Sequence, residues 1–280
     1  MKDANSISGP LKAFFWVIIL AVLIVTCYPI FWVMSSSLKT SAELVSSPSY
    51  ALPRSFDLGH YVTAITRSNL PRYYLNSTIV AFFVLLFIIL LGAPAAFSIS
   101  KIHFKQSEHV MTYFLLGIMI PSFVALIPMF QMYNKVGLRN TYTSLILPQV
   151  GFGLPMCIYL YSGFMKYVPN SLVESAVIDG ASSFQVFTKI IFPMAKNSTM
   201  TILVLDFVGA WNEYTYANTF MTKSYMKTLP IGLNDFIGDM GSRDWGATFA
   251  AIVIAVLPTL ILYFFLNKSV MEGMAAGAVK

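Results

Sequence analysis

Six long runs of apolar residues, separated by shorter polar segments, constrain the folding of this 280-residue chain more than any other feature. A helix rises about 1.5 Å per residue, so about 20 apolar residues cross a bilayer core of about 30 Å. A helix also satisfies its own backbone hydrogen bonds, which lipid cannot do. The sequence therefore predicts an all-α, polytopic membrane protein. We expect one domain over residues 1–280, with six transmembrane helices at residues 13–34, 73–99, 110–132, 143–164, 198–221 and 246–266.

The composition agrees with a chain that faces lipid. Hydrophobic residues make up 57% and charged residues 11%, against about 45–50% and about 25% in soluble domains. The net charge of +6 is scattered between the apolar runs, so nucleic acid is not an expected partner. Cys27 and Cys157 lie inside apolar runs, which predicts small buried side chains and no disulfide. No metal site is expected, because no histidine is paired with a carboxylate at helical spacing.

Charge does not fix the orientation of the six helices. Six crossings place both termini on the same side of the membrane. The 18 Lys and Arg residues divide equally between the two sets of connecting segments. The excess of positive charge that marks cytoplasmic loops is therefore missing, and orientation must come from another feature.

The segment 165–197, between the fourth and fifth runs, carries the most consistent local signals. Ser171 with Glu174, and Ser182 with Gln185, have the spacing of capping boxes at helix starts. Gly180 suits the left-handed position just after a helix, and Pro193 suits the start of the next one. These signals predict two short helices that meet at a bend.

The same segment resembles the coupling-loop signature of ABC importer permease subunits. The matching residues are Glu174, Ser175, Ala176, Gly180, Ile190 and Pro193, with Phe192 where leucine is usual. Further motifs extend the resemblance along almost the whole chain, in the order of the carbohydrate-importer branch: Asn76-Ser77, 137–141, Trp211-Asn212-Glu213, 228–233 and 273–280. Within that branch the chain is similar to the smaller six-helix permease of maltose-type importers.

The resemblance implies a permease of the bacterial plasma membrane that has no catalysis or bound cofactor of its own. A second, different permease would complete the pore, and an extracellular or periplasmic solute-binding protein would deliver a carbohydrate. Two cytoplasmic ATPase subunits would bind ATP and Mg²⁺, since this chain lacks a phosphate-loop motif. The coupling loop 165–197 and both termini would be cytoplasmic, and the loop 222–245 external.

The resemblance also assigns candidate sites. The ATPase would contact Glu174, Ser175, Ala176, Asp179, Gly180 and Ala181, with the carboxylate of Glu174 facing an arginine. Alternatively, Glu174 only completes a capping box with Ser171. The C-terminal tail, with Gly277 and Lys280, would also contact the ATPase, and the external loop would meet the binding protein through Gly232, Asn234, Asp235 and Gly238. A solvated hairpin is the simpler interpretation of that loop.

The fifth run supplies the candidate sugar path. Asp206 lies well inside it, and Trp211, Asn212 and Glu213 close it. An ionisable residue within a spanning helix usually faces the bundle interior or a water-filled cavity. A structural hydrogen bond to a neighbouring helix would explain Asp206 equally well.

Two other classes of membrane protein compete with the importer. In an ion-coupled secondary transporter, Asp206 and Glu213 would bind the coupling ion near the midplane. Against this, the chain has only six runs, no internal repeat, and its best-specified motif in a loop. A membrane enzyme would need a convergent His, Ser or carboxylate cluster, which the sequence does not suggest.

Overall fold

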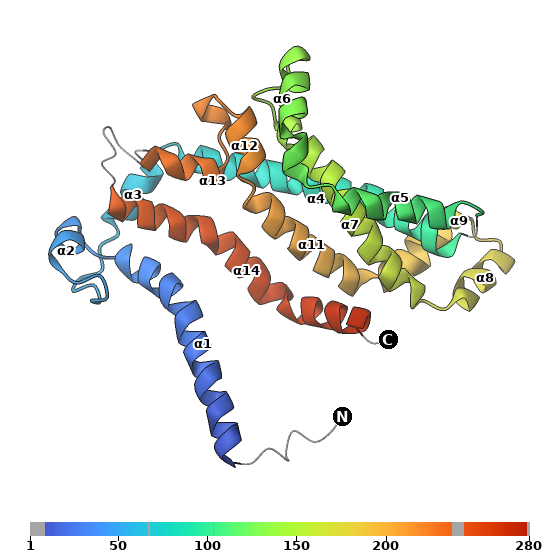
Figure 1. The fold of residues 1–280 in the computed structure, drawn as a ribbon, viewed down its shortest axis with the longest axis horizontal. Coiled ribbons are helices and arrows are strands. Elements are labelled where there is room, and N and C mark those ends of the chain that lie inside the picture. The colour runs from blue at the N-terminus through green and yellow to red at the C-terminus, as the bar shows by residue number, and fades with distance from the viewer. Residues whose placement is uncertain (1–8, 67, 103, 237–243, 279–280) are drawn as a thin grey trace. The chain divides into compact units, whose positions relative to one another are not determined.

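A computed structural model describes residues 9–66, 68–102, 104–236 and 244–278, with side chains as far as residue 266 (Figure 1). All regular elements in these ranges are helical, which confirms the predicted all-α class. The chain divides into two compact units. Unit 1 comprises residues 1–68 and 235–254, and unit 2 comprises residues 69–234 and 255–280.

Unit 1 contains α1 (Gly9–Ser36), α2 (Ser41–Ser46), α3 (Gly59–Thr66) and the first part of α14 (Trp245–Ala278). The Trp32 ring of α1 packs edge-on against Phe249, with ring centroids 5.2 Å apart. A capping box starts α2, where the backbone N–H of Thr40 donates to Glu43 and lowers the pKa of that carboxyl. Along α1 most apolar side chains are exposed, as expected for a helix that faces lipid.

The centre of unit 2 is the pair α4 (Leu70–Lys101) and α7 (Tyr142–Lys166), flanked by α5 (Ser107–Met119) and α11 (Lys196–Trp211). Two glycines allow the central pair to approach closely. A Cβ on Gly92 would lie 2.5 Å from the Cys157 sulfur, and one on Gly153 would lie 2.8 Å from Ile88. Small residues have this role where lipid provides no hydrophobic drive for helices to associate.

Two of the six predicted spans are broken rather than straight. The expected span 110–132 is not one continuous helix, because α5 ends at Met119 and the chain bends by 81° into η2 (Ser122–Ala125) and α6 (Leu126–Lys135). Pro121 explains the break, since it lacks an N–H and forces the preceding Ile120 into extended backbone.

In the fifth span, α11 ends at Trp211 and α12 (Thr215–Phe220) follows after a short gap. A 75° bend also separates residues 183–194 from residues 196–220, just before the predicted start of this span at residue 198. Within the described residues, four helices are long and apolar enough to cross a membrane individually, and the number rises to as many as six if each bent pair counts as one span.

The first part of the segment predicted as an external loop is folded onto α4. It forms η4 (Ser224–Met226), α13 (Leu229–Gly232) and η5 (Leu233–Phe236). The Asn76 amide donates to the carbonyls of Tyr225 and Lys227, and the Leu229 N–H donates to Ser77. This part is therefore not a solvated hairpin.

Candidate functional site

The candidate coupling elbow consists of α8 (Asn170–Ile178) and α9 (Ser183–Val186), at the end of unit 2 where α4 and α7 finish (Figure 1). Gly180 has a φ of +84°, which side chains with a Cβ rarely adopt. Its N–H donates to the Val177 carbonyl, and the Ala181 N–H donates to the Ala176 carbonyl. This pair of bonds is a Schellman motif, so the predicted helix stop at Gly180 is confirmed.

The two predicted capping boxes have different outcomes. The second forms, with Gln185 N–H donating to Ser182 Oγ at 3.3 Å and Ser182 N–H donating to Gln185 Oε1 at 2.8 Å. The first was predicted wrongly, because Pro169 precedes the helix and α8 already begins at Asn170, which places Ser171 inside the helix. Glu174 consequently has no capping role, and its carboxylate is exposed without a partner among the described residues.

Apolar side chains stand on the elbow beside its two carboxylates. Ile178 is 84% exposed and Phe184 is 74% exposed, next to the exposed Glu174 and Asp179. The sequence analysis did not select Ile178 or Phe184, although apolar residues next to a helix-stopping glycine were visible. We call Glu174, Ile178, Asp179 and Phe184 the elbow surface. It combines acidic groups with unpartnered apolar area, which is typical of a docking surface.

Lys101 anchors the elbow to the end of α4. The side chain is only 6% exposed, and its Nζ donates to the Val168 carbonyl and, at 2.8 Å, to the Asn170 side-chain oxygen. A buried ammonium is costly unless hydrogen-bonded, so these contacts fix where α8 begins. The sequence alone gives no sign of this anchor, because residues far apart in sequence carry no local signal of their contact.

A second anchor lies beyond α9. The chain continues through a π-helical turn, η3 (Phe187–Ile191), and α10 (Phe192–Met194) before the bend into α11. The Phe187 ring packs on Phe97 of α4 at 5.4 Å, and Val186 and Ile191 are buried. Lys101 contacts the start of the elbow and Phe97 contacts the residue that follows it, so α4 fixes the elbow at both ends.

The candidate sugar-path residues have separate environments. Asp206 is half-buried on α11, facing α7 at Gly153, and its carboxylate has no hydrogen bond with the described part of the chain. Trp211 is buried and donates from Nε1 to the Ala255 carbonyl at 2.9 Å. Asn212 donates to the Val208 carbonyl, and Glu213 accepts from the Tyr216 and Ala217 N–H groups at 2.6 and 3.0 Å. Three of the four thus have structural partners.

The remaining candidate residues are distributed as follows. Gly232, expected to meet the binding protein, is buried under the Tyr73 ring, where a Cβ would lie 2.1 Å away, so its role here is close packing. Asn234 is exposed and donates to the Tyr214 hydroxyl at 3.3 Å, next to Asp235. Gly277 is in the last turn of α14, and Gly238 and Lys280 lie outside the described residues. Within the described residues no group of His, Cys, Asp and Glu could hold a metal ion.

Comparison with known families identifies the class of protein. The family model of the binding-protein-dependent transport system inner membrane component matches residues 88–274. The chain belongs to this family, so it is a permease component of an inner membrane transport system and not an enzyme. The membership suggested by the sequence motifs is therefore confirmed.

Individual relatives named as sugar permeases match this chain over most of their length. The diacetylchitobiose uptake system permease protein NgcG of Streptomyces coelicolor is 31% identical over 258 residues, covering 92% of this chain and 85% of NgcG. The trehalose/maltose transport system permease protein MalG of Thermococcus litoralis is 31% identical over 260 residues, covering 92% of each chain.

A solved structure shares the fold. It is a bacterial ABC transporter involved in the import of the acidic polysaccharide alginate, with a TM-score of 0.81 and 20% identity. The match covers 94% of this chain and 98% of the other. At this identity the likeness shows the ABC permease fold alone.

Proposed function

We propose that this chain is the transmembrane permease subunit of an ATP-driven importer, and that it translocates an oligosaccharide delivered by an external solute-binding protein. One observation carries the proposal. In this member of the family, residues of α4 contact both ends of the elbow, and the elbow surface is exposed. A stiff, anchored element of this kind can pass a rigid-body movement to the helices that line a path.

The partner of the elbow surface is an ATPase subunit. Glu174 and Asp179 suit an arginine or lysine, and Ile178 and Phe184 suit an apolar cleft. The other candidate residues, Ser175, Ala176, Gly180 and Ala181, give the turn its shape. Two ATPase subunits bind ATP and Mg²⁺, and a second, different permease completes the pore. The elbow and both termini are then cytoplasmic.

A sugar is the solute that the relatives favour. NgcG and MalG are named for diacetylchitobiose and for trehalose and maltose. In this chain Asp206 is the candidate to contact the sugar, because its carboxylate retains its full hydrogen-bonding capacity. Trp211, Asn212 and Glu213 shape the end of α11, and Asn234 and Asp235 face the binding protein at the external end.

An ion-coupled secondary transporter is the competing function. It would use Asp206 and Glu213 for the coupling ion, but two backbone N–H groups already occupy the Glu213 carboxylate. This observation favours the importer.

Co-purification and transport assays test the proposal together. An ATPase subunit and a second permease should purify with the tagged chain. Sugar uptake into vesicles loaded with ATP should continue with a protonophore and stop with vanadate. Uptake that stops with the protonophore while ATP is present would instead support the secondary transporter.

A further inference from the structure

A groove between α5 and α7 is not explained by coupling or by the sugar path. It consists of two adjoining cavities, of about 410 and about 730 Å³, which share Met111, Ser162 and Lys166. The helices meet closely at one end of the groove, where a Cβ on Gly117 would lie 3.1 Å from Pro155. From there they separate toward Ser107, the first residue of α5, and Lys166, the last residue of α7.

The smaller cavity, at the Ser107 and Lys166 end of the groove, is lined by polar as well as apolar side chains. It is lined by the carboxylate-bearing Glu108, the cationic Lys166 and several hydroxyl-bearing residues, which are Ser100, Ser107, Thr112 and Ser162. Ser162 is 1% exposed, and its hydroxyl has no hydrogen-bond partner in the part of the chain that the structure describes. An unpaired buried hydroxyl is costly, so a ligand atom that bonds to it is stabilised.

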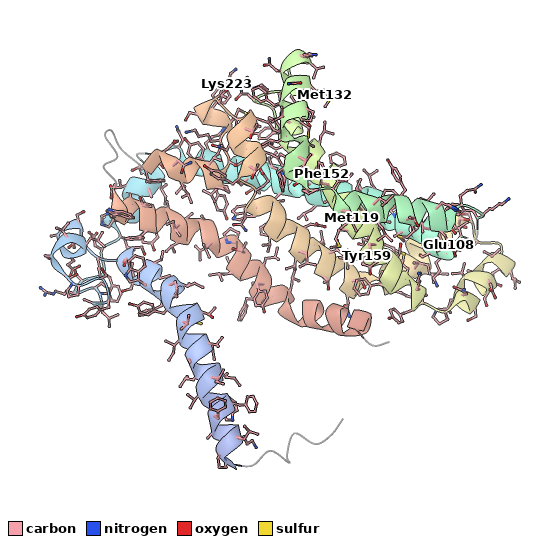
Figure 2. All side chains as sticks on the ribbon, viewed as in Figure 1. Glu108, Met119, Met132, Phe152, Tyr159 and Lys223 are labelled. Carbon is pink, nitrogen blue, oxygen red and sulfur yellow. The ribbon has the colours of Figure 1, made fainter. Side chains whose placement is uncertain are left out.

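The larger cavity shares the Lys166 end with the smaller one, extends along α5 and α7 as far as Leu115 and Tyr159, and is mainly apolar. Leu115, Tyr159, Leu160 and Phe164 line it, and Tyr159 is half exposed. Figure 2 labels Glu108 near the start of α5 and Tyr159 farther along α7 toward the bundle centre. The groove therefore has a charged, hydroxyl-bearing end at Glu108 and Lys166 and a mainly apolar part at Leu115 and Tyr159. With α5 and α7 as membrane spans, this order matches that of a lipid headgroup and its acyl chains.

We propose that this groove binds one phospholipid with a phosphate and a primary ammonium, of the phosphatidylethanolamine type. The phosphate lies at Lys166 and Ser162, the ammonium lies at Glu108, and an acyl chain follows Leu115 and Tyr159. Opposite charges in one cavity suit a zwitterion, whereas an anionic headgroup leaves Glu108 facing a like charge. The proposal is independent of which sugar the importer carries.

Native mass spectrometry of the full-length chain, purified with its accompanying subunits, tests the site. Lys166→Gln should lower the retained phosphatidylethanolamine about tenfold, because a charge-assisted hydrogen bond contributes about 1.5–3 kcal/mol. Lys135→Gln is the matched control, since Lys135 is likewise an exposed lysine at a helix end, outside both cavities. It should retain the lipid.

Two more variants keep the test decisive. Glu108→Gln should reverse a wild-type preference for phosphatidylethanolamine over phosphatidylglycerol. Leu115→Trp should expel the lipid without changing any charge. Equal retention by wild type and Lys166→Gln overturns the proposal. It is also overturned if the wild-type complex retains no such lipid, which would mean that another subunit covers the groove.

Discussion

At the scale of single residues, Lys101 ties the elbow to the centre of unit 2. Its ammonium bridges the end of α4 to Val168 and Asn170, so under the proposed function a movement of the elbow would be passed to a central helix. The exposed Glu174 has the complementary position, on the outer side of the same elbow. One residue holds the elbow to the permease, and the other is available to a partner.

Replacing Lys101 with methionine should loosen the elbow without preventing membrane insertion. Methionine keeps most of the apolar stem but loses both hydrogen bonds, each from a charged donor. We expect amide hydrogen exchange over residues 168–186 to become about tenfold faster, with a corresponding loss of uptake. Lys101→Arg keeps the charge and should retain partial activity. Unchanged exchange in Lys101→Met would show that the anchor does not hold the elbow.

Replacing Glu174 with glutamine should uncouple ATP hydrolysis from transport. Glutamine keeps the size and helix propensity of the side chain but removes its charge, which weakens a contact with an arginine. Uptake should fall about tenfold while basal ATPase activity persists, and Glu174→Asp should be less affected. Normal uptake by Glu174→Gln would count directly against the assignment of Glu174 as an ATPase contact.

At the scale of elements, two glycines serve different physical needs. Gly180 meets nothing within 4 Å, so its need is the positive φ of the elbow turn. Gly232 has no positive φ. Glycine is required there because the Tyr73 ring leaves no room for a Cβ. The local sequence pattern predicted the role of Gly180 but not the packing role of Gly232, since close packing against a residue of another helix leaves no local pattern.

Gly180→Ala should strain the elbow turn by about 1–2 kcal/mol, the cost of a Cβ in left-handed backbone. The strain acts on the elbow alone, so we expect faster hydrogen exchange over residues 176–186 and lower uptake. The melting temperature of the purified complex should hardly change. Asparagine tolerates this conformation better than alanine does. The exchange rate and uptake of Gly180→Asn should therefore lie between those of the wild type and those of Gly180→Ala.

Gly232→Ala should displace α13 from α4. The added methyl would overlap the Tyr73 ring, and such overpacking costs about 1–3 kcal/mol. We expect a lower melting temperature and easier proteolysis near residues 222–236. Gly151→Ala, where nothing lies within 4 Å, serves as the control and should be neutral or stabilising. Equal stability of both variants would exclude close packing as the role of Gly232.

At the scale of the whole molecule, apolar run length was enough to predict the helical class, and the motifs were enough to predict the family. Run length did not predict the 81° break before Pro121, because a proline inside a spanning helix can also be tolerated. Apolar run length also did not predict the short helices at residues 215–236. This segment is held by hydrogen bonds with Asn76, Ser77 and Asn140. Contacts of this kind join distant parts of the chain and are invisible in local sequence.

The orientation of the molecule is left open by the equal division of its positive charges and is open to a direct test. In a background with Cys27 and Cys157 replaced by alanine, Ser175→Cys and Lys223→Cys each provide a single exposed thiol, the first on the elbow helix α8 and the second in the segment predicted to be external. An impermeant maleimide added outside intact cells should label Cys at position 223 but not at 175. Permeabilised cells should allow labelling of both. The reverse pattern would place the elbow outside the cell, where no ATPase could reach it, and would overturn the importer assignment.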